Sequence, residues 1–306
     1  MKSASGKKTK VGATKKSRQT KTRRGGSKES SLRVVYSGPS GASTKSPITL
    51  LTDFGNADYF VAAMKGVILS NNPTARIIDI THDIPAQDIE AAAFTLLAAH
   101  SAFPKGTIHV AVVDPGVGSK RRAILIKVAG QFFVGPDNGI FSYICDGAEL
   151  RVFHLNNPKY FRHPVSDTFN GRDIFAPVAA ALSRGIVPQK LGIEVSDYVR
   201  LSSLQAAVSW NGVISGRIIH TDHFGNCVTN ITRNELTEKM IAGGFRLTIH
   251  GHQVDRFQRL FAAEPDSNSV FCIWGSAGFL ELAVKNGSAA NQLKIKRGDP
   301  VVVTPS

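Results

Sequence analysis

Long apolar runs are missing from this chain of 306 residues. No uninterrupted apolar stretch reaches the roughly 18 residues that a membrane-spanning helix needs. The first residues are also not followed by the short apolar segment of a secretory signal. We therefore expect neither a membrane span nor secretion, and we predict a cytoplasmic location.

Cysteine is equally scarce. Cys145, Cys227 and Cys272 are the three cysteines, and their wide separation matches neither a disulfide framework nor a zinc site. His250 and His252 lie two residues apart, but the sequence offers no third ligand beside them. We expect a reducing compartment and no bound metal.

Glycine-rich phosphate-binding motifs are absent as well. GxGxxG does not follow an apolar run, and GxxxxGK[ST] does not occur. The sequence does not indicate a loop that cradles phosphate, and we predict no resident cofactor.

Acidic residues are almost absent from the N-terminal segment. Residues 1–46 hold 13 Lys or Arg and one acid, whereas the remaining 260 residues hold 24 basic and 22 acidic residues. Because this segment is rich in Lys, Ser, Thr and Gly and poor in apolar residues, we predict a disordered basic tail. Three interpretations of the tail stay open: an organelle transit peptide, a weak tether to nucleic acid, and a solubilising extension, which we favour.

Apolar runs and helical stripes alternate from Ile48 onward. This order of strands and helices predicts βαβ units, and therefore an α/β N-terminal domain at residues 47–190 with a mostly parallel sheet and flanking helices. Asp88 is the expected N-cap of the second helix. The expected strands are 48–55, 75–80, 108–113, 123–128 and 132–134; the expected helices are 59–69 and 88–99, with more helix in 139–190.

The later part of the chain is rich in strands. After a predicted linker at 191–205, few helices interrupt the pattern, so we expect a smaller β-barrel-like C-terminal domain at residues 206–306. The expected strands are 213–220, 227–231, 245–249, 270–274, 279–284 and 300–304, with a short helix near 234–241.

Polar loops follow three successive N-terminal strands. Asp53 lies at the end of the first strand, His82 and Asp83 follow the second, and Asp114 follows the third, with Lys120-Arg121-Arg122 close behind. Because the carboxyl ends of parallel strands meet at one edge of a sheet, we expect these groups to gather into a polar site.

The segment DTFNGRDIFAP, residues 167–177, is the most informative part of the later helical region. Gly171 is expected to open a helix over 174–182 that carries Arg172 and Asp173 in its first turn. An arginine at this end opposes the helix dipole. Its pairing with Asp173 or another acid is one interpretation, and contact with a ligand is the other.

Seven segments occur in a specific order: TDFG (52–55), DITH (79–82), VVDPGVGSKRR (112–122), GPDNG (135–139), FNGRDIFAP (169–177), DHFGNCVTNI (222–231) and GSAGFLELA (275–283). From about Ile48 to Thr304, the chain thereby resembles the S-adenosyl-L-methionine hydroxide adenosyltransferase family, also called SAM hydrolases. This family is related to fluorinase and chlorinase. The resemblance implies an α/β domain followed by a β-barrel-like domain. It also implies a homotrimer whose active sites lie between the N-terminal domain of one subunit and the C-terminal domain of its neighbour.

The resemblance further implies an enzyme that cleaves S-adenosyl-L-methionine with water into adenosine and L-methionine. Asp53 matches the family aspartate that holds the ribose hydroxyls. Phe224 and Asn226 match positions near the adenine. Asp222 and Ser276 match positions at the methionine end.

Asp114 and Arg121 match two members of a proposed water-activating trio of Asp, Arg and His. A sulfonium leaves readily, so an oriented water behind C5′ is the main requirement, worth up to roughly 7–11 kcal/mol of the barrier. Arg121 can supply a positive charge and Asp114 an acceptor. Asp114 also argues against halide transfer, because a carboxylate repels an anion that must be desolvated.

The third member of the trio is Asn170 in this chain. Asparagine can hydrogen-bond a water but cannot take its proton, and general base catalysis is typically worth about 10²–10⁴-fold. Our hypothesis is that Asn170 positions the water while Asp114 and Arg121 provide the electrostatics. The alternatives are a weak or inactive adenosine- or S-adenosylmethionine-binding protein, and a protein tethered to nucleic acid by the basic tail.

Overall fold

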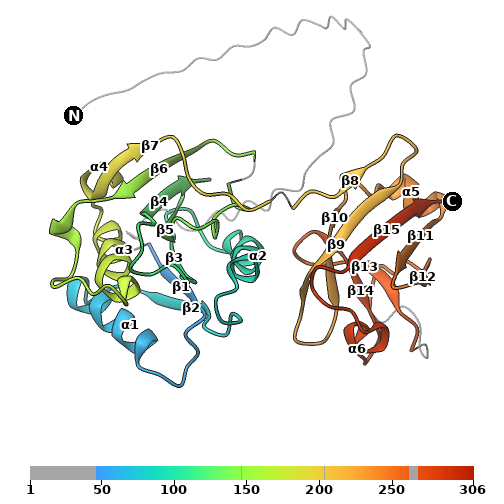
Figure 1. Cartoon of the computed structure of the whole chain (residues 1–306), viewed down its shortest axis with the longest axis horizontal. Coiled ribbons are helices and arrows are strands. Elements are labelled where there is room, and N and C mark those ends of the chain that lie inside the picture. The colour runs from blue at the N-terminus through green and yellow to red at the C-terminus, as the bar shows by residue number, and fades with distance from the viewer. Residues whose placement is uncertain (1–45, 146, 203, 262–267) are drawn as a thin grey trace, which may run out of the picture. The chain divides into compact units, whose positions relative to one another are not determined.

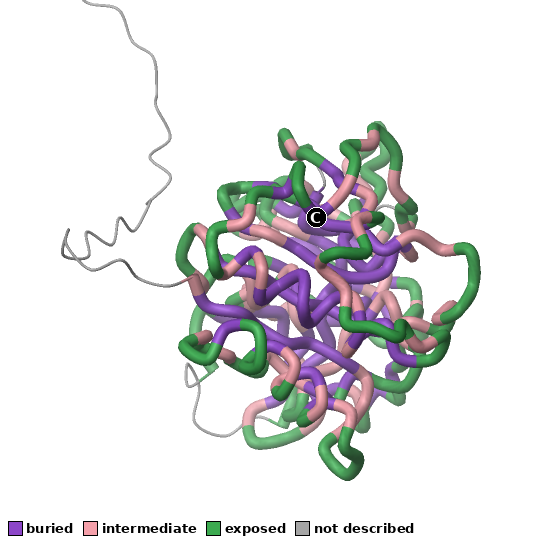
Figure 2. The backbone as a smooth tube through the Cα atoms, turned by 90° about the vertical axis from the view of Figure 1, so that its left-hand side faces the viewer, coloured by how far each residue is buried: buried purple, intermediate pink, exposed green. Residues whose placement is uncertain are grey.

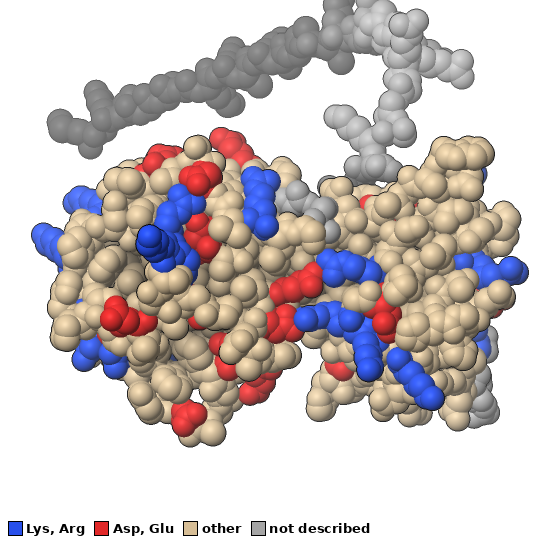
Figure 3. Space-filling view, viewed as in Figure 1, with Lys and Arg blue, Asp and Glu red and all other residues tan. Residues whose placement is uncertain are grey.

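The computed structural model describes residues 46–145, 147–202, 204–261 and 268–306, and these residues form two β-sheets with helices (Figure 1). Apart from Ser46, the predicted basic tail lies outside the described residues. None of the described helices has the length and apolar character needed to cross a membrane. Lys and Arg are interspersed with Asp and Glu on the face shown in Figure 3, in keeping with the nearly balanced charge of residues 47–306.

The first sheet is mixed and has seven strands in the order β2-β1-β3-β5-β4-β6-β7. Strands β2, β1, β3 and β5 are parallel neighbours, whereas β5, β4, β6 and β7 pair antiparallel. The predicted α/β class is confirmed, and the parallel arrangement is limited to the first four strands in this order. The strands are β1 Ile48–Thr52, β2 Ile77–Thr81, β3 Ile108–Val112, β4 Ala123–Val128, β5 Gln131–Pro136, β6 Leu150–Leu155 and β7 Gly192–Val195.

A two-residue turn explains the antiparallel part of this sheet. Ala129 and Gly130 join β4 to β5 with φ values of 51° and 79°. Such a short turn can only connect antiparallel strands, because a parallel crossover needs a dozen residues or more. Strand β6 lies where only helices were expected, and β7 lies inside the range predicted as linker. The segment that joins the two sheets therefore starts after Val195.

Helices cover both faces of the first sheet. Helices α1 (Phe60–Asn71) and α3 (Ala176–Ser183) pack on one face, while α2 (Ile89–His100) packs on the other. Strand β1 is buried along its whole length, because Leu50 faces α1 and α3 while Leu51 faces α2. Buried residues are the purple parts of the tube in Figure 2. The predicted cap is confirmed: the Asp88 carboxylate accepts the N–H of Ala91. The helical elements also include η1 (Pro158–Tyr160), a π-helical turn η2 (Gly171–Phe175) and α4 (Pro188–Leu191).

The second sheet is antiparallel and forms a nearly closed barrel. Seven strands follow the order β12-β11-β15-β9-β10-β14-β13, and β8 pairs with β9. The six predicted strands and the predicted barrel-like fold are confirmed, whereas β8, β12 and α6 were not predicted. The elements are β8 Ala207–Val208, β9 Ile214–Thr221, β10 Cys227–Thr232, α5 Glu238–Gly243, β11 Phe245–Ile249, β12 His252–Val254, β13 Phe271–Trp274, β14 Phe279–Ala283, α6 Ala289–Leu293 and β15 Pro300–Pro305.

Candidate active site

The carboxyl ends of β1 and β3 meet at one edge of the first sheet. Asp53 and Asp114, which follow these strands, both line a cavity of about 420 Å³. The third predicted loop contributes differently, because His82 is buried: its Nδ1 lies 2.9 Å from Thr52 Oγ1 and its Nε2 lies 3.1 Å from Asp79 Oδ1. The loops after β1 and β3 therefore each bring an acid to the cavity. The loop after β2 instead places His82 against Thr52, at the end of β1.

Asp114, Arg121 and Asn170 form one hydrogen-bonded group at this cavity. The Arg121 guanidinium donates from Nε to Asp114 Oδ1 at 2.9 Å and from Nη2 to Asp114 Oδ2. The same Nη2 donates to Asn170 Oδ1 at 2.7 Å. The side chains of Asp114 and Arg121 are only 6% and 11% exposed, so little water competes with this ion pair.

A close backbone approach brings the Asp114 loop to the segment before Asn170. Gly118 has a φ of 78°, and a Cβ atom there would lie 2.6 Å from the carbonyl oxygen of Asp167. Only glycine fits this position without a shift of the backbone. The glycine thus allows residues 49 positions apart, Arg121 and Asn170, to meet.

Both ends of the Asn170 amide are engaged. Oδ1 accepts from Arg121, and Nδ2 donates to the carbonyl oxygen of Ser166 at 3.1 Å. The residue directly precedes the π-helical turn η2, a local widening that is frequent at functional sites. Asn170 is therefore fixed in orientation, with its oxygen turned toward a cation and its nitrogen toward a carbonyl.

Asp173 anchors the chain around this turn. It is fully buried and accepts from Arg172 at 2.8 Å and from Arg162 at 3.1 Å. Burial opposes ionisation, but hydrogen bonds from Arg172 and the Ser166 N–H hold the pKa of Asp173 below its ordinary value. The structure thus shows the ion-pair interpretation of Arg172, whose guanidinium also lies 5.0 Å over the Phe169 ring.

Asp53 is held by a backbone group. Its Oδ2 accepts the N–H of Gln87 at 2.8 Å, and Gln87 has a left-handed φ of 65°. Oδ1 of Asp53 has no hydrogen-bond partner within the described ranges. One carboxylate oxygen is therefore oriented by the loop, and the other is available to a ligand.

Aromatic rings that the sequence reasoning missed line the same cavity. Phe54, Phe60 and Phe169 are among its lining residues, and their ring centroids lie 5.2–6.0 Å apart. Phe54 and Phe169 stand inside two of the seven segments quoted above, so the segments contained this signal. Phe60 had been assigned only to a helix.

The C-terminal candidates gather around a loop after β9. Asp222 Oδ1 accepts the N–H groups of Phe224 and Asn226 at 2.9 and 2.8 Å, and Asp222 Oδ2 accepts from Asn226 Nδ2 at 2.8 Å. Phe224 is 74% exposed. Phe224 and Asn226 line a second cavity, of about 720 Å³, together with Ser288. The structure does not bring this group together with Asp53 and Asp114, which line the other cavity.

Ser276 is exposed in a turn before β14 and is not among the lining residues of either cavity. The Glu281 carboxyl supports this turn from beneath, because a Cβ atom at Gly275 would lie 1.7 Å from Glu281 Oε1. Burial, and then the charge of Asp222, raise the pKa of Glu281 to about 7. Glu281 therefore lies between the loop of Asp222 and the turn of Ser276, a position that the sequence reasoning missed.

Two other predictions concern histidines and metals. His250 Nε2 lies 3.0 Å from Asp299 Oδ2 in an ion-pair arrangement. Within the part of the chain that the structure describes, no group of three or more His, Cys, Asp or Glu side chains is placed to hold a metal ion.

Comparison with known proteins identifies the family. The model of the SAM hydroxide adenosyltransferase N-terminal domain matches residues 48–192, and the model of the C-terminal domain matches residues 216–302. The chain belongs to the SAM hydroxide adenosyltransferase family. The expected family is thus confirmed.

Several relatives of this family member carry a named activity. The (R)-S-adenosyl-L-methionine hydrolase of Thermus thermophilus is 37% identical over 83% of this chain and 98% of the relative. The hydrolase of the same name from Methanocaldococcus jannaschii is 34% identical over 84% and 95%. The fluorinase of Nocardia brasiliensis is more distant, at 26% identity over 84% and 96%.

Solved structures show the same fold. An uncharacterized conserved protein from Thermotoga maritima superposes with a TM-score of 0.77 at 33% identity, covering 84% of this chain and 99% of that protein. A conserved hypothetical protein from Thermus thermophilus gives a TM-score of 0.67 at 36% identity, covering 85% of this chain and all of that protein.

Proposed function

We propose that this member of the family hydrolyses S-adenosyl-L-methionine to adenosine and L-methionine. The observation that carries the proposal is the hydrogen-bonded group of Asp114, Arg121 and Asn170, of which Asp114 and Asn170 line the same cavity as Asp53. The hydrolases at 34–37% identity support it, because they are named for this class of substrate.

In the proposed reaction, a water oxygen attacks C5′ of the substrate from the side opposite the sulfur. The new C5′–O bond forms as the C5′–S bond breaks, and the bonding pair goes to sulfur, which becomes the neutral thioether of methionine. Asp53 would hold the ribose through its available oxygen. Asp114 would accept a hydrogen bond from the water, since a carboxylate can accept several bonds beyond the two from Arg121. One proton of the water stays on the 5′ oxygen of adenosine, and the other passes to solvent.

Asn170 fits a positioning role in this scheme. Its oxygen accepts from Arg121, so it holds the guanidinium in place and cannot serve as a base. Pre-organisation of this kind is a recognised source of rate enhancement without proton transfer. Asp114 favours water over halide here, because its carboxylate can accept a hydrogen bond from water, whereas a halide ion has no hydrogen to donate.

The candidate residues of the C-terminal domain would complete the site from another subunit. Phe224 and Asn226 would contact the adenine, and Asp222 and Ser276 the methionine end. We propose a homotrimer whose sites combine the first cavity of one subunit with the second cavity of its neighbour; the separate lining of the two cavities supports this arrangement. Coexpressed Asp114→Asn and Asp222→Asn chains should then restore about a quarter of the sites in mixed oligomers, since each site draws on two chains. The assay uses substrate well below KM, where both variants alone are impaired. Mixtures no more active than either variant alone would rule out shared sites.

The sulfonium epimer is part of the proposal. The named relatives are hydrolases of the (R) form, and we propose the same preference for this chain. The decisive experiment incubates the full chain with each epimer in chloride-free buffer, and then with added chloride or fluoride, and resolves the products by chromatography. Adenosine and methionine from the (R) epimer under both conditions are expected, whereas a 5′-halo-adenosine would contradict the role given to Asp114.

A binding protein is the second candidate, and the engaged amide of Asn170 is the observation that favours it. Tight binding of S-adenosylmethionine in calorimetry, without adenosine after prolonged incubation, would select this candidate. Asn170→His tests the link directly. If a missing base limits turnover, the variant should turn over faster than wild type. Its kcat should then rise with pH around the ordinary imidazole pKa of about 6.5, as the histidine loses its proton. No gain in rate would speak against a missing base as the limit on turnover.

A further inference from the structure

Three phenylalanine rings form one wall of the cavity that holds Asp53 and Asp114. Phe54 follows β1, Phe60 begins α1, and Phe169 precedes the π-helical turn. Phe169 is buried and Phe54 and Phe60 are half-buried, and all three are lining residues of the cavity. The rings pack at tilted or edge-on angles, as expected for aromatic groups that share one cluster.

The same cavity carries one uncompensated negative charge. Its acidic lining residues are Asp53 and Asp114, and the charge of Asp114 is neutralised by the Arg121 guanidinium. Asp53 accepts a backbone N–H from Gln87 and forms no ion pair among the residues that the structure describes. Aromatic rings beside an unpaired carboxylate create an environment that favours a cation.

The cluster already holds one cation on its outer side. The Arg172 guanidinium lies 5.0 Å over the Phe169 ring, and Asp173 neutralises its charge with two hydrogen bonds. Phe169 is thus occupied by a protein group. Phe54 and Phe60 are the rings that remain for a ligand in the cavity.

We propose that Phe54 and Phe60 select the positively charged sulfonium of the substrate against a neutral thioether that carries the same adenosyl group. The inference rests on the proposed function and adds the means of discrimination to it. A sulfonium has no hydrogen to donate, so a protein can recognise it only through negative charge and polarisable surface. Aromatic rings provide such a surface without offering a nucleophile.

The test measures the affinity of the full chain for S-adenosylmethionine, S-adenosylhomocysteine and adenosine, the first from the concentration dependence of the single-turnover rate and the other two by calorimetry. The first two ligands differ by one methyl group and one positive charge. Wild type should bind the sulfonium on the order of 3- to 30-fold more tightly than the thioether, the range of a cation–aromatic contact. Phe60→Leu should lower this ratio and leave the adenosine affinity unchanged; Asp53 and Phe54, which remain, should keep part of the preference. Phe60→Tyr keeps a ring and should keep the ratio.

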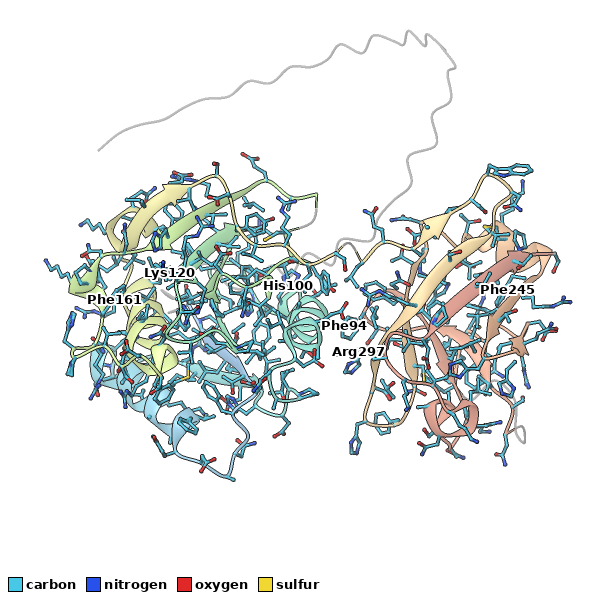
Figure 4. All side chains as sticks on the ribbon, in the orientation of Figure 1. Phe94, His100, Lys120, Phe161, Phe245 and Arg297 are labelled. Atoms are coloured by element: carbon cyan, nitrogen blue, oxygen red, sulfur yellow. The ribbon has the colours of Figure 1, made fainter. Side chains whose placement is uncertain are left out.

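Phe161→Leu is the matched control, because Phe161, labelled in Figure 4, packs against the same core but is not a lining residue of the cavity. It should leave the ratio unchanged. If thermal unfolding shows that Phe60→Leu does not fold, Phe54→Leu takes its place.

Three outcomes would overturn the inference, and they differ in what else they affect. Equal binding of both ligands by wild type would remove the aromatic selection and leave hydrolysis standing. If Phe60→Leu lost the same affinity for both ligands, the ring would contribute only packing and would not distinguish the charged from the neutral ligand. Failure of wild type to bind any of the three compounds would remove the proposed function itself.

Discussion

The two acid-bearing loops of this protein hold their carboxylates in different ways. Asp114, after β3, is bound by a charged guanidinium that also reaches Asn170, so the group combines positions far apart in the sequence. Asp222, after β9, is bound by neutral donors of its own loop, the N–H groups of Phe224 and Asn226 and the Asn226 amide. The first arrangement cancels charge and suits a neutral water, whereas the second keeps a negative charge and suits an ammonium group.

Asp114→Asn should have the largest effect on this comparison. It removes the carboxylate that we propose as the acceptor for the water and leaves the Arg121 charge without its counterion, so kcat should fall by about 10²–10⁴-fold. Adenosine release at saturating substrate measures the effect. Asp83→Asn changes an exposed acid at the end of β2 and should be neutral. A folded Asp114→Asn variant with the wild-type rate would remove Asp114 from the chemistry.

Asp222→Asn should change binding more than rate. The substitution weakens an ordered loop and removes the negative charge, at a cost of about 1–2 kcal/mol, which raises KM by about 5- to 30-fold. Steady-state kinetics should show kcat nearly unchanged. A fall in kcat comparable to that of Asp114→Asn, with KM unaltered, would break the proposed division of roles between the loops.

Glu281→Gln should alter the pH dependence of stability. The pKa of Glu281 is raised from 4.5 to about 7, so between these values the folded state holds a proton that the unfolded state has lost. The contribution of protonated Glu281 to the free energy of unfolding is therefore present at low pH and is lost as pH rises through about 7, by about 1–3 kcal/mol in total. Urea unfolding should give similar free energies for wild type and variant near pH 4.5, and a more stable variant at pH 8. The same difference in unfolding free energy between wild type and variant at both pH values would contradict the raised pKa of Glu281.

Gln87→Gly should have the smallest effect. The Gln87 backbone N–H, not its side chain, binds Asp53, and glycine adopts the left-handed φ of 65° more readily. The gain in the folded state is offset by the greater freedom of glycine in the unfolded chain, so stability should change by less than about 1 kcal/mol. Activity should stay within about twofold of wild type. A severe loss of activity would show that the Gln87 side chain itself contacts the substrate.

The sequence predicts the parts of the molecule that depend on neighbours in the chain. Buried runs such as Ile108–Val112 were assigned as strands, and the Asp88 cap was assigned from its place before a helical stripe. Three acid-bearing strand ends also predicted the edge where Asp53 and Asp114 meet.

The parts that were missed depend on contacts across the fold. Strand β7 is only four residues long and becomes a strand because β6 pairs with it, about 40 residues earlier. The engagement of the Asn170 amide depends on Arg121, and the aromatic wall combines rings from positions 54, 60 and 169. Periodicity does not report such encounters, because it records only which face of its own element a residue occupies.

The three buried cysteines have a practical consequence. Cys145 belongs to the core of the first sheet, while Cys227 and Cys272 belong to the core of the barrel. Burial raises the pKa of Cys145 and Cys227 to about 11, and that of Cys272 further, so hardly any reactive thiolate exists near neutral pH. Alkylation of each thiol must then wait until its own core opens. The alkylation rate of Cys145 would therefore report the opening of the first sheet's core, and the rates of Cys227 and Cys272 would report the opening of the barrel, without any introduced label.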